Sequence, residues 1–470
     1  MTTSERELRS TGPMENWSVS RHLEDFYFGV TSFVKLSSPT SKVTRGLLHG
    51  RLVEAVKETF WSNFNFRTTI DFPSGKFLTL SPGETPIDIT WYERNEENAI
   101  DSVLEAEVNK KFPDDQPLWR VWAVASDVEF ETFEIGVTVH HAFADGLSSA
   151  NLLHTFIRAF LASEKEETSL SEGPVIITYD PHTDAQKNEL SSSVHTILPN
   201  SKPSIGVLLK EIATKILLPK FLRPKDMYWS GTKDLDLQTI QQISAKPKQY
   251  PTKIKSLSIP LDSLSQKCKL HGTTIHGALS TAAILATHVF KPTQPLKFAT
   301  PINLRSHCEP PLSNDSIGVY VSELSTTHAP PKENPNLEEF WPMAIQFKEQ
   351  LKGSLEPAIY TIGLMEYISD FQKFLHTERD SLVHVNGHKG SLEISNLGKQ
   401  DWKDLPKTQF EIEELGFAQS TSVLSPVFTI SAITWKNSCK LILSYLLDVN
   451  EAEKVTKFWT EFETILRSIS

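Results

Sequence analysis

Two histidines and one acidic residue stand close together in the segment His140-His141-Ala142-Phe143-Ala144-Asp145-Gly146. An imidazole held away from bulk water can take a proton from a hydroxyl or an amine near neutral pH and return it to a leaving group. We therefore expect His141 to act as a general base while an acceptor attacks an acyl carbonyl. Such proton transfer contributes roughly 10² to 10⁴ in rate, so holding both substrates in one channel must supply much of the rest.

The chain around this segment has the pattern of a strand, a turn and a helix. Apolar and polar residues alternate from Thr132 to Val139, which predicts a half-buried strand. His141 continues the apolar parity and is therefore expected to point into the protein. Apolar residues then recur at helical spacing from Leu147 to Leu161. A turn between two rigid elements is a common place to hold a reactive side chain.

The other residues of the segment are assigned supporting roles. Asp145 is expected to cap the following helix or to pair with a distant arginine, and both roles can hold together. Gly146 is expected to permit a tight backbone turn. His140 has the opposite parity from His141, so a structural role is favoured for it. Adjacent histidines at a strand end diverge and no third ligand is evident, so no metal site is predicted.

The composition is that of a globular protein with more than one domain. The 470 residues carry a net charge of −11, with 22% charged and 39% hydrophobic residues. Without a basic excess to neutralise phosphates, nucleic acid is not an expected partner. Cys268, Cys308 and Cys439 form neither a disulfide framework nor a zinc spacing. No signal peptide or membrane-spanning apolar run is visible, so we expect a cytoplasmic protein.

Element patterns divide the chain into two α/β halves, residues 1–200 and 201–470. Residues 163–201 are rich in Ser, Asp and Glu and predict a linker or long surface loop at the end of the first half. The basic stretch 205–225 is interpreted as a crossover helix, with a membrane-surface patch or the rim of a substrate entrance as the alternative. Residues 451–469 predict a helix that packs on the core rather than a lipid anchor. Two halves indicate a site in the cleft between them.

Three common signatures are absent from the sequence: the GxSxG nucleophile elbow, the GxxxxGK phosphate loop and the GxGxxG dinucleotide fingerprint. Their absence disfavours hydrolases of the α/β type, P-loop nucleotide hydrolysis and ordinary nicotinamide redox chemistry.

Short motifs along the chain support one family. Residues 140–146 have the form HHxxxDG, and Gly12, Glu15 and Arg21 form a pattern near the N-terminus. Further motifs are Pro117–Arg120, His271–His276, Thr300–Arg305 and Ser395–Gly398. In this order they resemble the fungal alcohol acetyltransferase family, within the superfamily of CoA-dependent acyltransferases that includes chloramphenicol acetyltransferases and condensation domains. The resemblance runs from residue 12 to residue 398 and so covers most of the chain.

The resemblance implies two similar chloramphenicol-acetyltransferase-like α/β domains with mixed sheets and a channel between them. Acetyl-CoA would be the co-substrate, entering from one face with the acceptor entering from the other, and no metal would take part. His141 would be the general base of a direct transfer in a ternary complex. Asp145 would be structural and would pair with Arg305, which stands at the matching position.

The donor to the tetrahedral oxyanion is not identified securely by the sequence. Asn396 lies in the matching turn, and Ser420 and Thr421 lie in a polar turn between apolar strands. For each of them an ordinary role in satisfying a turn is the alternative.

The leading hypothesis is transfer of an acetyl group from acetyl-CoA to a small or lipid-like alcohol. N-acetylation of an amine, such as a sphingoid-like base or a toxin, is the close alternative because His141 would serve both reactions. A non-catalytic binding member of the superfamily and a condensation domain acting on carrier-tethered substrates are further hypotheses. We expect a monomer, with peripheral contact to the endoplasmic reticulum or lipid droplets left open.

Overall fold

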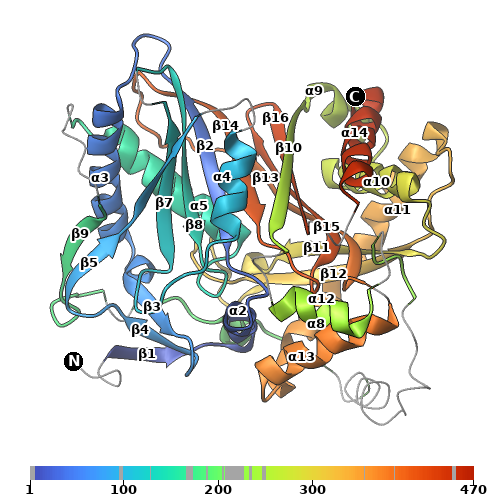
Figure 1. Ribbon diagram of the computed structural model, residues 1–470, viewed down its shortest axis with the longest axis horizontal. Coiled ribbons are helices and arrows are strands. Elements are labelled where there is room, and N and C mark those ends of the chain that lie inside the picture. Colours follow the sequence, from blue (N-terminus) through green and yellow to red (C-terminus); the bar gives the residue numbers. More distant parts are fainter. Residues whose placement is uncertain are drawn as a thin grey trace.

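Two large β-sheets stand side by side in the protein, each covered by helices (Figure 1). The structure is a computed structural model, and it describes residues 6–94, 99–126, 129–165, 173–186, 189–203, 206, 227–231, 235–245, 250–353, 355–385, 387–446 and 451–470. Most of the predicted basic stretch 205–225 therefore lies outside the described residues.

The first sheet carries the strand that leads to the histidine segment. Its strands lie in the order β14 (Glu411–Gln419), β2 (Val30–Ser37), β8 (Thr132–Val139), β7 (Trp119–Ala125) and β6 (Ile89–Glu93). One face of the sheet packs against α3 (Arg45–Ser62) and α5 (Gly146–Ala162), and the other face packs against α4 (Ala99–Val108). Strand β8 is consequently buried on both faces, not on one as its alternating pattern predicts.

The segment 163–201 is more ordered than its polar composition predicts. Within it, β9 (Val175–Tyr179) pairs antiparallel with β5 (Gly83–Ile87). Farther along, the short helix α6 (Val194–Ile197) buries Val194. The predicted linker or long surface loop therefore contains two short elements, and its role as the end of the first half stays a prediction. A third small sheet has the order β1 (Glu7–Ser10), β4 (Lys76–Thr79), β3 (Thr68–Asp71).

The second large sheet is mixed. Its strands lie in the order β10 (Thr252–Pro260), β16 (Ser438–Leu446), β15 (Pro426–Trp435), β13 (Gly390–Gln400), β11 (Leu296–Asn303) and β12 (Val321–His328). Strand β13 runs parallel to both of its neighbours, and the other pairs are antiparallel. One face packs on α9 (Asp262–Leu270), α10 (Ile275–Ala286), α11 (Phe340–Lys352) and α14 (Ala452–Ile469).

Shorter helices complete the structure. The α-helices are α2 (Pro13–Leu23), α8 (Leu237–Ala245), α12 (Leu355–Leu364) and α13 (Phe371–Ser381), which lie together at the bottom of Figure 1. The 3-10 helices are Phe64–Arg67, Thr287–Phe290, Arg305–His307, Leu337–Glu339, Met365–Tyr367 and Leu382–His384.

One strand from the second half of the chain joins the first sheet. Strand β14 follows the central strands of the second sheet in sequence, yet it pairs with β2 and forms the edge of the first sheet. The chain therefore passes from one sheet to the other between β13 and β14 and returns at β15. This crossing brings the ends of strands from both sheets to a common junction. The division of the chain at residue 200 stays a prediction.

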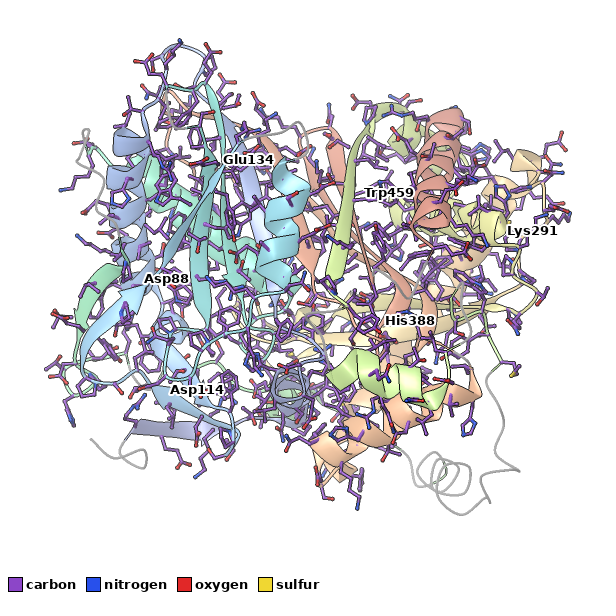
Figure 2. The ribbon with its side chains drawn as sticks, viewed as in Figure 1. Asp88, Asp114, Glu134, Lys291, His388 and Trp459 are labelled. Atoms are coloured by element: carbon purple, nitrogen blue, oxygen red, sulfur yellow. The ribbon has the colours of Figure 1, made fainter. Side chains whose placement is uncertain are left out.

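Helix α14 packs on the core through its apolar face. Val455, Phe458, Phe462 and Leu466 are each fully buried, and Trp459 points toward the same cluster (Figure 2). The apolar residues on this face of α14 are therefore used for packing on the core, as expected from the sequence. Among the helices that the structure describes, none has the length and apolar character needed to cross a bilayer.

Gly136 gives a test of how tightly the first sheet is packed. It lies opposite Trp122 in the β7–β8 ladder, and a Cβ atom at Gly136 would approach the Trp122 ring to 2.1 Å. Trp122 cannot easily move, because its Nε1 donates a hydrogen bond of 2.9 Å to Thr31 Oγ1. We expect Gly136→Ala to lower the free energy of unfolding by about 1–3 kcal/mol, measured by urea unfolding followed by circular dichroism.

The matched control is Gly353→Ala at the end of α11. A Cβ atom there has its nearest neighbour at 3.8 Å and the backbone φ is −75°, so the change should stay within about 0.5 kcal/mol. Equal unfolding midpoints for the two variants would contradict the packing argument.

Candidate functional site

A cavity of about 240 Å³ lies at the junction of the two sheets. Its walls come from α2, from the turn after β8, from the end of β14 and from strands β11, β12, β13 and β15. The charged, aromatic and polar side chains that line it include Trp17, Arg21, Tyr27, His141, Asp145, Lys297, Glu323, Lys389, Glu393, Ser395, Gln419 and Ser420. The cavity is the expected cleft between the halves, and it contains the residue that the sequence singles out for chemistry.

His141 is the second residue after β8 and lines the cavity, as its parity predicts. Its Nδ1 atom is buried and has no hydrogen-bond partner among the described residues, whereas Nε2 is not enclosed in this way. The Nε2 atom is therefore the ring nitrogen available to a ligand. The ring of Tyr27 packs edge-on against the imidazole, with 5.3 Å between ring centroids.

The surroundings of His141 keep its ring neutral. Burial is the first cause and the positive charge of Arg21 the second, and together they lower the pKa of His141 to about 4. The backbone carbonyl of His141 and the carboxylate of Asp145 oppose this shift without reversing it. At neutral pH the imidazole can therefore accept a proton, and the imidazolium that forms is a ready proton donor.

Asp145 has both of the roles considered for it. Its Oδ1 accepts a 2.8 Å hydrogen bond from the Ser148 backbone N–H and thereby caps α5. Its two oxygens also accept bonds of 2.9 and 3.0 Å from the Arg305 guanidinium. Burial alone would raise the pKa of Asp145, but Arg305 and the backbone N–H groups of Ser148 and Tyr320 outweigh burial and lower it.

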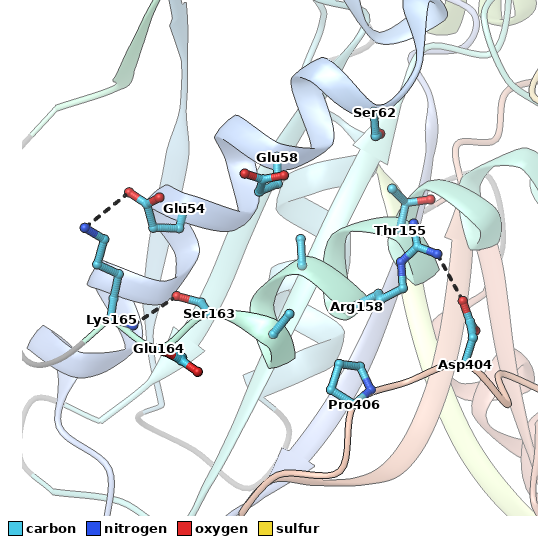
Figure 3. Close-up of a pocket in the computed structure, with 12 residues that line it drawn as sticks. Glu54, Glu58, Ser62, Thr155, Arg158, Ser163, Glu164, Lys165, Asp404 and Pro406 are labelled. Atoms are coloured by element: carbon cyan, nitrogen blue, oxygen red, sulfur yellow. Dashed lines mark hydrogen bonds and ion pairs between the residues drawn. The ribbon is translucent and has the colours of Figure 1, made fainter.

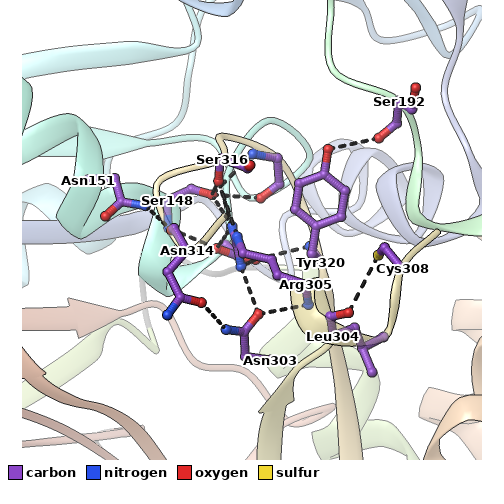
Figure 4. A network of polar contacts seen from close by, with 12 residues as sticks. Ser148, Asn151, Ser192, Asn303, Leu304, Arg305, Cys308, Asn314, Ser316 and Tyr320 are labelled. Atoms are coloured by element: carbon purple, nitrogen blue, oxygen red, sulfur yellow. Dashed lines mark hydrogen bonds and ion pairs between the residues drawn. The ribbon is translucent and has the colours of Figure 1, made fainter. Parts of the chain in front are cut away.

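The Asp145–Arg305 ion pair joins the two halves. Arg305 lies just after β11, and its guanidinium also donates to Ser148 Oγ and to the Ser316 carbonyl, at 2.7 and 2.9 Å (Figure 4). Both charged side chains are almost completely buried. Because every charged atom of the pair has a partner, the arrangement can hold the turn after β8 against the second sheet.

His140 and Gly146 differ in how they meet their expected roles. The ring of His140 is buried away from the cavity, where it packs beside His22 with 4.7 Å between centroids, and its Nδ1 accepts from the Ala142 N–H. Gly146 is the first residue of α5 and does not have a positive φ. A Cβ atom at Gly146 would instead lie 3.1 Å from Leu397, at the cavity wall.

Asn396 and Thr421 do not reach the cavity. Asn396 Oδ1 accepts from the Gly398 N–H at 2.8 Å, which satisfies the turn in β13. Thr421 has a buried Oγ1, and its backbone N–H donates to Thr252. Their sequence neighbours Ser395 and Ser420 line the cavity instead, because alternate side chains of an extended segment point in opposite directions. Ser420 Oγ is already occupied by backbone partners, including the Val108 carbonyl at 2.6 Å.

Several cavity residues are missed by sequence reasoning. Tyr27, Glu393 and Gln419 carry no motif of their own, and Arg21 is noted only as part of the N-terminal pattern. One signal was present: in β13, Leu392 and Ile394 face the core, so Glu393 must face the opposite side of a central strand. A charged residue at such a position indicates a cavity or a partner.

The N-terminal pattern also has a structural explanation. Glu15 accepts from the Gly12 N–H at 2.6 Å and pairs with Arg9 at 2.7 Å, which holds the start of α2. A Cβ atom at Gly12 would lie 1.8 Å from Ser193 Oγ, so any side chain there would force Ser193 to shift. The helix start is thereby set, and Arg21 near the end of α2 reaches the cavity.

A second pocket lies away from these residues. It is an open groove of about 760 Å³ between α3, α5 and the segment around Asp404 (Figure 3). Its walls carry the exposed ion pairs Arg158–Asp404 and Lys165–Glu54. No residue of the histidine segment lines it. Within the described ranges, no group of three or more His, Cys, Asp or Glu side chains could hold a metal ion.

Comparison with known proteins identifies the relatives of this chain. A sequence profile of the family named alcohol acetyltransferase matches residues 90–467. No curated protein sequence matches the chain. The solved structure of TRI3 trichothecene 15-O-acetyltransferase from Fusarium sporotrichioides is similar with a TM-score of 0.66 at 13% identity, over 100% of this chain and 96% of that one.

Two further solved structures are similar over nearly their whole length. Polyketide synthase associated protein 5 from Mycobacterium tuberculosis has a TM-score of 0.59 at 13% identity, over 99% of each chain. The epimerization domain from the third module of tyrocidine synthetase B has a TM-score of 0.56 at 16% identity, over 99% of this chain and 97% of that one. At these identities the likeness concerns the fold, and it confirms the predicted two-domain, chloramphenicol-acetyltransferase-like class.

Proposed function

The chain belongs to the alcohol acetyltransferase family, and from this premise we propose that it transfers an acetyl group from acetyl-CoA to the hydroxyl of an alcohol. The observation that carries the proposal is a neutral His141 whose Nε2 is the ring nitrogen available in a cavity between the two halves. A general base in that position is what acyl transfer to a hydroxyl requires.

The reaction needs no covalent intermediate on the protein. The acceptor oxygen attacks the thioester carbonyl carbon while its proton passes to His141 Nε2. The tetrahedral intermediate then loses the sulfur of CoA, and the same proton passes from His141 to that sulfur. The products are an acetyl ester and free CoA, so atoms and charges balance. Holding both substrates together supplies the part of the rate enhancement that proton transfer does not.

In this mechanism Asp145 and Arg305 are positioning residues. Their ion pair fixes the turn that presents His141 and ties it to the second sheet. Asp145 does not carry the proton, because its two oxygens are already used by Arg305 and by backbone N–H groups.

The proposal is tested with the purified full chain, acetyl-CoA and a panel of alcohols and amines. Release of the CoA thiol is followed with time, and the acetylated product is identified by mass spectrometry. An ester formed in proportion to thiol is the expected result. An amide as the product would favour the N-acetylation alternative, and no acetylated product with any acceptor would overturn the proposal.

The pH dependence follows from the lowered pKa of His141. The base must be neutral to work, so activity is present above its pKa and is lost as the pH falls through it. With a pKa of about 4, we expect kcat/KM to change by less than about twofold between about pH 7.5 and pH 5.5, whereas a histidine with the ordinary pKa of about 6.5 would lose about tenfold. Steady-state assays across this range measure the change in kcat/KM. As a control for unfolding, enzyme preincubated at the lower pH is assayed at the higher pH. A midpoint near the ordinary value would contradict the expectation.

A further inference from the structure

A carboxyl group from the central strand of the second sheet faces the cavity. Glu393 on β13 lies in register with Ala299 on β11 and with Thr429 on β15, and all three line the cavity. The two neighbours are small, so they leave space around the longer side chain between them. One wall of the cavity is therefore a row across three strands with a single acidic group at its centre.

Glu393 is linked to His141 by a chain of contacts. Gln419 Nε2 donates to Glu393 Oε1 at 3.1 Å, and Gln419 Oε1 accepts from the Tyr27 hydroxyl at 3.1 Å. The ring of Tyr27 in turn packs against His141. In the described part of the chain, Glu393 Oε2 has no hydrogen-bond partner, and it is not enclosed by the protein. This oxygen is available to a ligand in the space that His141 also faces.

An arginine side chain faces the same space from α2. The Arg21 guanidinium lies 4.4 Å from the centre of the Tyr27 ring, and its Nη2 donates to Ser18 Oγ at 3.0 Å. Arg21 Nε is buried without a partner, and no carboxylate of the described residues forms an ion pair with Arg21. Arg21 and Glu393 therefore face one cavity as a guanidinium and a carboxyl group, and no ion pair joins them.

The chemistry of this pair selects among possible ligand groups. A carboxylate on the acceptor would suit Arg21, but it brings a third acid beside Glu393 and Glu323 and has no proton to donate to Glu393. An ammonium group would be repelled by Arg21 and by Lys297 and Lys389, which line the same cavity, and it has no acceptor atom for Arg21. A hydroxyl group satisfies both sides, because its proton can be donated to Glu393 while its oxygen accepts from Arg21.

We propose that Arg21 and Glu393 form a subsite for a second hydroxyl of the acceptor, so that this enzyme acetylates diols or polyhydroxylated, uncharged alcohols in preference to simple aliphatic ones. The inference rests on the proposed function and names its substrate class. Arg21 and Glu393 act as specificity-determining residues and take no part in proton transfer.

The state of Glu393 is compatible with this role. Burial first, and then the charge of Glu323, raise the pKa of Glu393 to about 8, although Gln419 and Arg21 oppose the rise. Near neutral pH its carboxyl group can therefore both donate and accept a hydrogen bond, which matches the capacity of a hydroxyl.

The acceptor fits this subsite better than the acyl donor does. The part of CoA next to the thioester carries only neutral amide groups. An amide carries its donor and its acceptor on two different atoms, whereas a hydroxyl presents both on one oxygen, which can lie between the guanidinium and the carboxyl group.

The experiment compares matched acceptors with the full chain and acetyl-CoA. The acceptors are butanol, butanediols with different spacings between the hydroxyls, an aminobutanol and hydroxybutanoate. We expect kcat/KM for the best butanediol to exceed that for butanol by about tenfold or more, as one well-placed hydrogen bond to a charged group allows. The two charged acceptors should be poorer than the diol. Equal kcat/KM for butanol and every diol would overturn the inference.

Variants assign the effect to residues. Glu393→Leu and Arg21→Leu should each raise KM for the diol and reduce the diol-to-butanol ratio of kcat/KM toward one. Glu393→Gln keeps a hydrogen-bond donor and acceptor, so its ratio should lie between those of Glu393→Leu and the wild type. A purely structural role would lower activity on both acceptors alike and leave the ratio unchanged. Glu413→Leu, at an exposed Glu that pairs with Lys35, is the matched control and should leave the ratio unchanged.

Two results separate this inference from the proposed function. Transfer to butanol and to diols at equal rates would leave the function standing and refute the subsite. A rise in KM for acetyl-CoA in Glu393→Leu, with an unchanged diol-to-butanol ratio, would place the subsite on the donor side and refute the inference. Absence of transfer to every acceptor by the wild-type chain would refute the proposed function itself.

Discussion

Replacing His141 by alanine is expected to lower kcat for acetyl transfer by about 10³- to 10⁴-fold, the upper part of the range for loss of a general base. The variant removes the ring nitrogen available to substrates in the cavity. Asp145 cannot replace it, because both of its oxygens are held by Arg305 and by backbone N–H groups. Release of the CoA thiol is measured while acetyl-CoA is varied at a fixed acceptor concentration, and then while the acceptor is varied at a fixed acetyl-CoA concentration.

The matched control for this prediction is a histidine outside the cavity. His154 lies on α5, where its ring stacks on Trp402 and pairs with Asp404. His154→Ala should change kcat by less than about twofold, since surface changes away from the site have small effects. A His141→Ala protein that keeps its fold by circular dichroism and releases thiol as fast as the wild type would refute the mechanism.

Breaking the buried ion pair is expected to have the largest effect on stability. Asp145→Asn keeps an oxygen that can cap α5 but leaves the Arg305 guanidinium buried without a counter-charge. Removing one partner of a buried pair costs about 3–5 kcal/mol. We therefore expect a large fall in the urea midpoint, together with a loss of activity, because the turn that presents His141 is no longer tied to the second sheet.

An exposed ion pair serves as the comparison. Asp401 and Lys403 are 2.8 Å apart but largely in solvent, so Asp401→Asn should cost no more than about 1 kcal/mol. Adding Arg305→Met to Asp145→Asn should recover part of the lost stability, because the uncompensated charge is then gone. If Asp145→Asn and Asp401→Asn had equal midpoints, the pair would not hold the two halves together.

The sequence alone was informative where structure depends on residues close in the chain. Strand parity and helical spacing around residues 140–146 predicted the strand, the turn and the helix, and placed His141 facing inward, as the structure has it. Asp145 could be predicted as a helix cap from its position. The pairing of Asp145 with Arg305 was implied only by the family resemblance, because residues 160 positions apart share no local sequence pattern.

The tertiary structure decided which side chains share the cavity. Arg21, Tyr27, Glu393 and Gln419 come from distant segments, and they meet because β14 crosses to the first sheet and returns the chain to the second. Crossing of this kind depends on long-range strand pairing and register, which no short-range periodicity specifies. The histidine segment thus determined the type of reaction, whereas the sheet junction determined which groups surround the acceptor. The physical reason is that a turn is formed by its own neighbours, while a cavity is formed by whichever strands become adjacent.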